Sequence, residues 1–186
     1  MKINCLTMNQ VQDILKEKFP FYSKYVNWLD NDFEDTENQD FTQTAFNLAC
    51  LPNRNLSVLE KINYLQDSEK NLVNELLKNN NLDTGHFLII HEYKQFPWVL
   101  QSFKDNEIVN KSISTMQHYT NNTYEQIVES YGFECFGKIS ELITELFYFP
   151  FFMNYRDINI LFFDKEYLIK IDHHLCFSII HSRLKD

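Results

Sequence analysis

Glycine is scarce in this chain of 186 residues and occurs only at Gly85, Gly132 and Gly137. A loop that cradles phosphate groups, or the fingerprint of a dinucleotide-binding fold, needs several glycines within a few residues so that the backbone can approach the ligand. The sequence contains no such cluster. It therefore argues against a nucleotide site of either kind, and we expect no cofactor.

Paired cysteines and long apolar runs are also missing. Cys5, Cys50, Cys135 and Cys176 form no C-x-x-C pair, which argues against a zinc ribbon or a thioredoxin-like site and predicts free thiols in a reducing compartment.

The stretch MKINCLTMNQ has no apolar signal segment, so we expect a cytoplasmic protein. The longest apolar run, residues 146–153, is far shorter than the roughly 20 residues that cross a bilayer, so no membrane span is predicted.

Basic residues are few relative to acidic ones. The chain has 17 Lys and Arg against 26 Asp and Glu, a net charge of −9, which disfavours nucleic-acid phosphate as the main ligand and favours a basic protein partner. Residues 29–40 carry no Lys or Arg at all. Their acidic residues are Asp30, Asp32, Glu34, Asp35, Glu37 and Asp40.

This acidic segment, residues 29–40, has two interpretations. It is a solvated loop of like charges, or it is a docking surface in which Phe33 is an aromatic anchor inside a charged rim. A calcium loop is disfavoured, because Asp35 occupies the sixth position, where glycine is needed, and Phe41 occupies the twelfth, where glutamate is needed.

Helix-start signals occur at four places in the sequence, three of them within residues 1–82. Four capping boxes predict helix N-termini, because the first side chain accepts from the backbone and the Gln or Glu three residues later reaches back. They are Thr7 with Gln10, Asp40 with Gln43, Ser57 with Glu60, and Thr123 with Gln126. The first predicts a helix that ends near Pro20, and the second predicts a helix from Phe41 onward.

The rest of the chain alternates strands and helices. Apolar and β-branched runs predict one antiparallel meander at about 86–114 and a second at 158–181, separated by two helices, the first capped by Gly132 and the second running from Ile139 to Phe147. In the second meander, one face carries Ile158, Ile160, Phe162, Tyr167, Ile169, Ile171, Leu175, Phe177 and Ile179. The predicted fold class is α+β in a single domain of residues 1–186, with the option of two lobes, a helical one over 1–82 and a mixed one over 83–186.

The tripeptide Asp172-His173-His174 is the strongest candidate for chemistry. It resembles one motif of a family of metal-dependent phosphoesterases, whose separate Asp-containing motifs and glycine-rich element are missing here. The alternative is a hairpin link, because Asp and His tolerate turn conformations. We expect the turn, with metal binding by these three residues as the competing hypothesis.

The sequence thus leads to a hypothesis of a non-enzymatic, stoichiometric binding protein. An immunity protein or antitoxin of a bacterium or phage, which neutralises a basic toxin such as a nuclease, fits the charge and the missing catalytic motifs. The alternatives are a metal-dependent hydrolase that uses Asp172, His173 and His174, and a homo-oligomeric structural protein.

Overall fold

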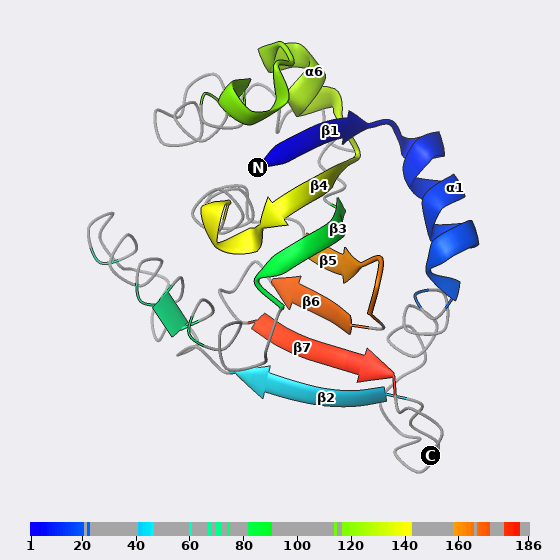
Figure 1. The fold of residues 1–186 in the computed structure, drawn as a ribbon, viewed down its shortest axis with the longest axis vertical. Coiled ribbons are helices and arrows are strands. Elements are labelled where there is room, and N and C mark those ends of the chain that lie inside the picture. The colour runs from blue at the N-terminus through cyan, green and yellow to red at the C-terminus, as the bar shows by residue number, and fades with distance from the viewer. Residues whose placement is uncertain are drawn as a thin grey trace.

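The computed structural model describes residues 1–20, 22, 41–46, 60, 67, 70–71, 74, 82–90, 114, 117–142, 158–165, 167–171 and 177–182. These residues form an α+β fold around one seven-stranded antiparallel sheet with the order β1-β4-β3-β5-β6-β7-β2 (Figure 1). The strands are β1 Lys2–Leu6, β2 Phe41–Phe46, β3 Thr84–Ile90, β4 Gly132–Lys138, β5 Ile158–Phe162, β6 Tyr167–Ile171 and β7 Phe177–Ser182. The helices are α1 Met8–Lys18, α6 Tyr124–Glu129 and the 3-10 turn η3 Ile139–Glu141.

The carboxy-terminal meander was correctly predicted. Strands β5, β6 and β7 are consecutive neighbours in the sheet, and Ile160 pairs with Ile169, which pairs in turn with Ile179. These three side chains are all buried. Period-two spacing of branched residues was sufficient here, because each register follows from the buried face.

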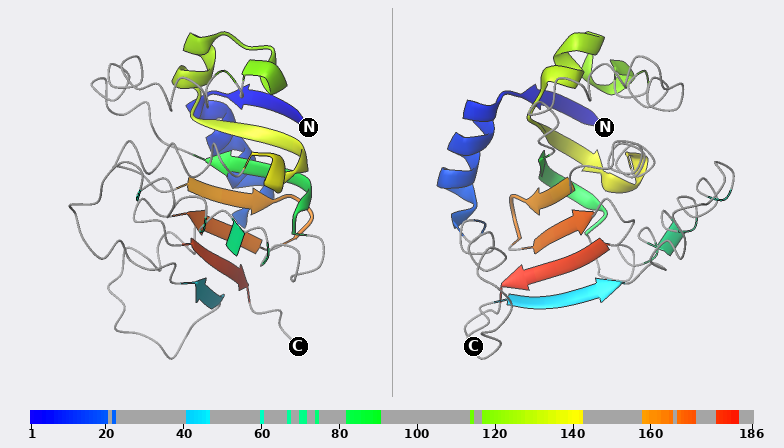
Figure 2. Two further views of the ribbon diagram at one scale, coloured as in Figure 1. Left: turned by 90° about the vertical axis from the view of Figure 1, so that its left-hand side faces the viewer. Right: turned by 180° about the vertical axis from the view of Figure 1, so that it is seen from behind.

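The hydrophobic core lies on both faces of the sheet. On one face, Val11 of α1 packs in a cluster with Leu88, Leu161 and Leu168, and Figure 2 shows α1 lying along that side. The opposite face buries Phe87, Ile89, Ile160 and Ile169, among others. The interior strand β3 is consequently buried on both sides from Phe87 to Ile90.

Two of the four predicted capping boxes are confirmed. Thr7 and Gln10 cap α1, which ends at Lys18 as Pro20 predicted, and Thr123 and Gln126 cap α6. The box of Ser57 with Glu60 lies mostly outside the described residues. The fourth, Asp40 with Gln43, is wrong as a helix start: residues 41–46 are strand β2, paired with β7 along their whole length. Cross-strand pairing outweighs a local capping signal in a segment rich in Phe and Thr.

A helical lobe over 1–82 does not hold for 2–6 or 41–46, which are strands at opposite edges of the sheet. The predicted meander at 86–114 is confirmed only in β3, since Ser114 is helical and residues 91–113 lie outside the described part. The two predicted meanders are also not separate, because β3 pairs with β5 within one sheet.

The prediction for residues 132–147 was wrong where the structure describes them. Gly132 opens strand β4 instead of capping a helix, and residues 139–141 form a single 3-10 turn. Residues 132–138 form a strand because β1 and β3 hydrogen-bond to its two sides. Helical spacing from Ile139 onward could not reveal these long-range partners.

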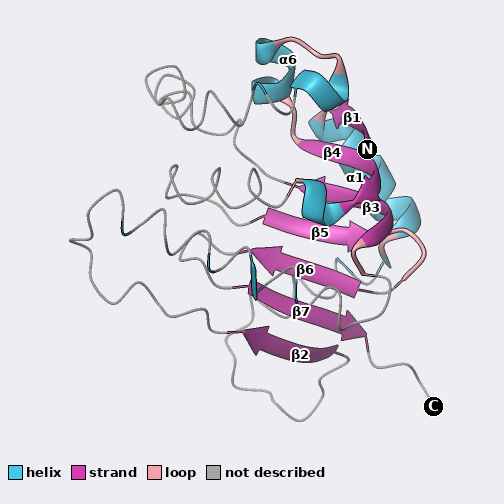
Figure 3. Ribbon diagram, turned by 60° about the vertical axis from the view of Figure 1, so that its left-hand side comes forward, coloured by secondary structure: helices cyan, strands magenta, loops and turns pink. Residues whose placement is uncertain are grey.

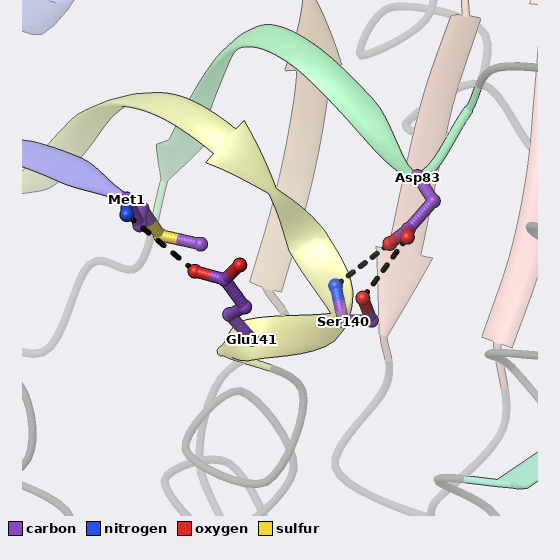
Figure 4. A network of polar contacts seen from close by, with 4 residues as sticks. All are labelled: Met1, Asp83, Ser140 and Glu141. Carbon is purple, nitrogen blue, oxygen red and sulfur yellow. Dashed lines mark hydrogen bonds and ion pairs between the residues drawn. The ribbon is translucent and has the colours of Figure 1, made fainter.

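A polar connection holds the turn after β4 against the start of β3. The carboxylate of Asp83 accepts hydrogen bonds from Ser140 N at 2.8 Å and from Ser140 Oγ at 3.0 Å, and Asp83 O accepts from Ile139 N at 2.8 Å (Figure 4). On the neighbouring residue, Glu141 Oε2 lies 3.5 Å from the amino group of Met1. The loop before β3, the turn after β4 and the start of β1 are thereby joined at one side of the sheet.

Candidate functional site

The residues predicted to bind a partner all lie outside the described part of the chain. This applies to Asp30, Asp32, Phe33, Glu34, Asp35, Glu37 and Asp40. Their connection to the fold is nevertheless defined, because Asp40 immediately precedes Phe41, the first residue of edge strand β2 (Figure 3). The acidic segment therefore leads directly into one edge of the sheet.

The metal candidates Asp172, His173 and His174 also lie outside the described residues. They belong to the connection between β6, which ends at Ile171, and β7, which begins at Phe177, and these two residues pair with each other. The five positions 172–176 between these paired residues include the predicted link. His181 lies towards the other end of β7, where it pairs with Tyr167, so it is remote from this connection.

The described residues contain one polar cluster that the sequence did not predict. His86 of β3, Glu134 of β4 and Asn4 of β1 come together from three adjacent strands. His86 Nε2 lies 2.9 Å from Glu134 Oε1, and Asn4 Nδ2 donates to Glu134 Oε2 at 3.2 Å. The side chains of His86 and Glu134 are about 33% and 24% exposed. We call these three residues the His86 cluster.

Aromatic rings enclose the imidazole of His86 on both faces. The ring of Phe163 is stacked on it at a centroid distance of 3.7 Å and an interplanar angle of 7°, and the ring of Phe136 is stacked on the other side at 4.1 Å and 16°. Lys2 Nζ lies 6.0 Å from the centroid of Phe136, while Phe19 meets Phe163 edge-on. The rings hold the imidazole plane fixed relative to Glu134.

The chemistry available to the His86 cluster follows from this geometry. When the imidazole is neutral, a carboxylate beside Nε2 favours the tautomer that carries its hydrogen there, because a carboxylate only accepts. Nδ1 then has a free lone pair for a hydrogen bond. The arrangement orients an imidazole, yet the described residues place no nucleophile beside it.

The two described cysteines are poor nucleophiles. Burial raises the pKa of the Cys5 thiol to about 11 and raises that of Cys135 well above its ordinary value, because both thiolates would lose hydration. Both are free thiols, as the sequence predicted. They lie on neighbouring strands, where Cys5 pairs with Phe133 and Cys135 pairs with Ile3.

Within the described ranges, no three His, Cys, Asp or Glu side chains converge as a metal site. Over the same ranges, none of the helices has the length and apolar character needed to span a bilayer. Comparisons with protein-family models, with curated proteins and with solved structures find no match to this chain.

The His86 cluster was missed because its members are far apart in sequence. His86 and Glu134 are separated by 48 positions, and Asn4 and Glu134 by 130. A strand assignment for β4 would have been the one available signal, since Glu134 and Phe136 then fall on the same face.

Proposed function

We propose that this protein is a non-enzymatic binding protein that covers a basic protein partner, concretely an immunity protein or antitoxin acting on a basic toxin such as a nuclease. The observation that carries the proposal is the charge distribution. Residues 29–40 hold six acids and no Lys or Arg in a chain of net charge −9, and this segment leads directly into edge strand β2.

Electrostatics gives such a segment a defined role in association. A concentrated negative charge steers a positively charged protein into encounter, and salt screens this effect over a Debye length of about 8 Å at physiological ionic strength. Phe33, embedded among the acids, supplies an apolar anchor of the kind that slows dissociation. The acidic residues should therefore affect mainly the association rate, and Phe33 should affect mainly the dissociation rate.

The first test is binding to candidate partners. Basic proteins encoded beside the gene are co-expressed with this chain, and co-purification of one of them together with neutralisation of its toxicity is expected. If none of them binds or is neutralised, the immunity hypothesis is wrong.

The second test reverses charge within the acidic segment. In a variant with Asp32, Glu34, Asp35 and Glu37 all replaced by Lys, we expect a slower association rate and a weaker dependence of that rate on salt. A matched control reverses Asp13, Glu17, Glu125 and Glu129, which are exposed on α1 and α6. Both variants change the net charge equally, so equal losses would show that total charge, and not the segment, governs encounter.

Metal-dependent hydrolysis by Asp172, His173 and His174 is the competing proposal. These residues occupy a hairpin connection whose two ends are fixed by the pairing of Ile171 with Phe177. Thermal melting with Mn²⁺, Zn²⁺ or Mg²⁺ separates the two proposals, because an ion that binds only the folded state must raise the melting temperature. A rise abolished by His173→Ala combined with His174→Ala would favour the hydrolase.

A further inference from the structure

The two edge strands of the sheet differ in how they would resist pairing with another strand. Edge strand β1 carries a charged residue, Lys2. Edge strand β2, with the sequence FTQTAF, has no charged residue, no proline and no glycine. Charge and proline are two common means by which proteins prevent edge pairing, and the sequence of β2 carries neither.

Strand β2 pairs with β7 along all six residues, from Phe41 opposite Ser182 to Phe46 opposite Phe177. Among the strands that the structure describes, β7 is the only neighbour of β2. In an antiparallel ladder, alternate residues direct their N–H and C=O groups to opposite sides of the strand. About three donors and three acceptors of β2 therefore point away from β7.

We propose that β2 pairs antiparallel with β2 of a second copy of this chain, centred on Thr44, which joins two seven-stranded sheets into one. In an antiparallel pair, residues directly opposite each other lie on the same face of the sheet. A two-fold axis perpendicular to the sheet preserves that face, so it must pass beside a residue that is paired with the same residue of the second copy. With Thr44 opposite Thr44 of the second copy, Thr42 lies opposite Phe46, and the same pair recurs by symmetry.

These pairs favour a second copy as the occupant of the edge. Thr opposite Thr and an aromatic opposite a β-branched residue are stabilising cross-strand pairs, each contributing about 0.2–1 kcal/mol relative to Ala opposite Ala. The alternative centre on Gln43 would place Asp40 opposite Phe46 and would lose both aromatic pairs. The centre on Thr44 is the one that pairs Thr with Thr as well as Phe46 with a β-branched residue.

Charge is compatible with this arrangement. Antiparallel pairing puts Phe41 of the two copies at opposite ends of the shared strands, roughly 20 Å apart at about 3.4 Å per residue, which exceeds a Debye length of about 8 Å. The acidic segments that precede Phe41 therefore join the shared strands at separate ends, and the residues that follow β2 in the sequence, 47–59, contain Arg54 and no acid. This inference is independent of the proposed toxin-binding function.

The experiment measures the mass of the full chain in solution by sedimentation and light scattering. We expect a dimer of twice the 22.4 kDa chain mass at protein concentrations on the order of 100 µM, and we expect added salt to strengthen it because each copy is acidic. Thr44→Lys and Thr44→Glu should each be monomeric, because each places like charges opposite one another at the axis. An equimolar mixture of the two variants should be dimeric again, since Lys then lies opposite Glu.

Lys2→Glu on the other edge strand is the matched control and should leave the dimer intact. If the substitutions at position 44 prevent folding, a mixture of the Gln43→Lys variant and the Ala45→Glu variant tests the same register on the other face of the strand. In this register, position 43 of one copy lies opposite position 45 of the other. Hydrogen exchange of the unmodified chain adds a measurement without substitution: the β2 amides should exchange at least tenfold more slowly at high than at low protein concentration. A chain that is monomeric throughout, or a dimer unaffected by both substitution pairs, would overturn the proposal.

Discussion

His86 Nε2 lies 2.9 Å from Glu134 Oε1, although the two residues are 48 positions apart in the chain. The same carboxylate accepts a hydrogen bond from Asn4, so one side chain of β4 binds one residue on each neighbouring strand. Phe136 and Phe163 enclose the imidazole. The His86 cluster therefore links the edge strand β1 through β4 to the interior strand β3 by side chains as well as by backbone pairing.

A double-mutant cycle should detect this link. His86→Phe keeps a planar ring between Phe136 and Phe163 but removes the hydrogen bond, while Glu134→Gln keeps the shape of the acceptor side chain. Because the pair is partly exposed, we expect a coupling free energy of roughly 0.5–1.5 kcal/mol, measured by urea unfolding of the four proteins.

The matched control is a cycle of His86→Phe with Lys138→Gln. Lys138 lies on the same strand as Glu134 but is exposed and pairs in register with Thr84. Its coupling with His86 should be within about 0.3 kcal/mol of zero. Equal coupling in both cycles would mean that the hydrogen bond to Glu134 has no specific effect on stability.

The described thiols should react slowly while the protein is folded. The thiolate is the reactive form, and burial raises the pKa of Cys5 to about 11 from an ordinary value of 9.0. At pH 8 the thiolate fraction of Cys5 is then about a hundredfold lower than in an unperturbed thiol, and it rises about tenfold per pH unit until the pH approaches 11. Cys135, which is fully buried, should be slower still.

Alkylation with iodoacetamide followed by mass spectrometry of the separate peptides would measure these rates. Site resolution is needed because Cys50 and Cys176 share the chain. In denaturant both Cys5 and Cys135 should label at the rate of a free thiol, which controls for the reagent. Rapid labelling of Cys5 in the folded protein at pH 8 would contradict its burial.

Local signals were sufficient where the structure depends on neighbours in sequence. The capping box of Thr7 and Gln10 correctly predicted the start of α1. Branched residues at every second position correctly predicted that Ile160 and Ile169 lie on the same buried face, where they pair. They failed where distant strands decide the outcome. Phe41–Phe46 follows a capping signal and still forms a strand, because β7 supplies a complete ladder of partners.

The candidate site was less predictable than the fold for the same reason. No pattern near His86 points to Glu134, since their proximity requires that β3 and β4 pair with Phe136 opposite His86. The apolar residues from Ile139 onward have helical spacing, and this pattern gives no indication of strand β4 before them. A seven-residue strand that contains two glycines has weak β propensity, so its pairing partners, and not its composition, determine it.

The capping box of α1 gives a prediction that depends on local contacts only. Thr7 Oγ1 accepts from Gln10 N at 3.4 Å, and Gln10 Oε1 accepts from Thr7 N at 2.9 Å. Thr7→Ala should lower the free energy of unfolding by about 0.5–2 kcal/mol, while Thr7→Ser, which keeps the hydroxyl, should lower it by much less. Thermal or urea unfolding would measure both, and an equal loss in the two variants would assign the effect to the methyl group.

Gly132 provides the sharpest packing prediction. A methyl group at this position would lie 2.6 Å from Ile89 O and 3.0 Å from the Cγ2 atom of Val11, in the contact between β4, β3 and α1. The first neighbour is backbone and cannot rotate away, so β4 must shift from β3 or α1 from the sheet. Gly132→Ala should therefore lower the free energy of unfolding by about 1–3 kcal/mol, measured by urea denaturation.

Gly85 is the matched control, because it lies in the neighbouring strand β3, where the nearest atom to an added methyl group is Asp164 Oδ1 at 4.0 Å. Its backbone is outside the left-handed region, where only Gly137 is found among the described glycines. Gly85→Ala should thus be neutral or raise stability by about 0.4–1 kcal/mol, since it restricts the unfolded chain without a clash. Opposite signs in the two variants would support the close approach of β4, β3 and α1 at Gly132. A Gly132→Ala protein as stable as the parent would show that β4 does not lie against Ile89 and Val11 in this way.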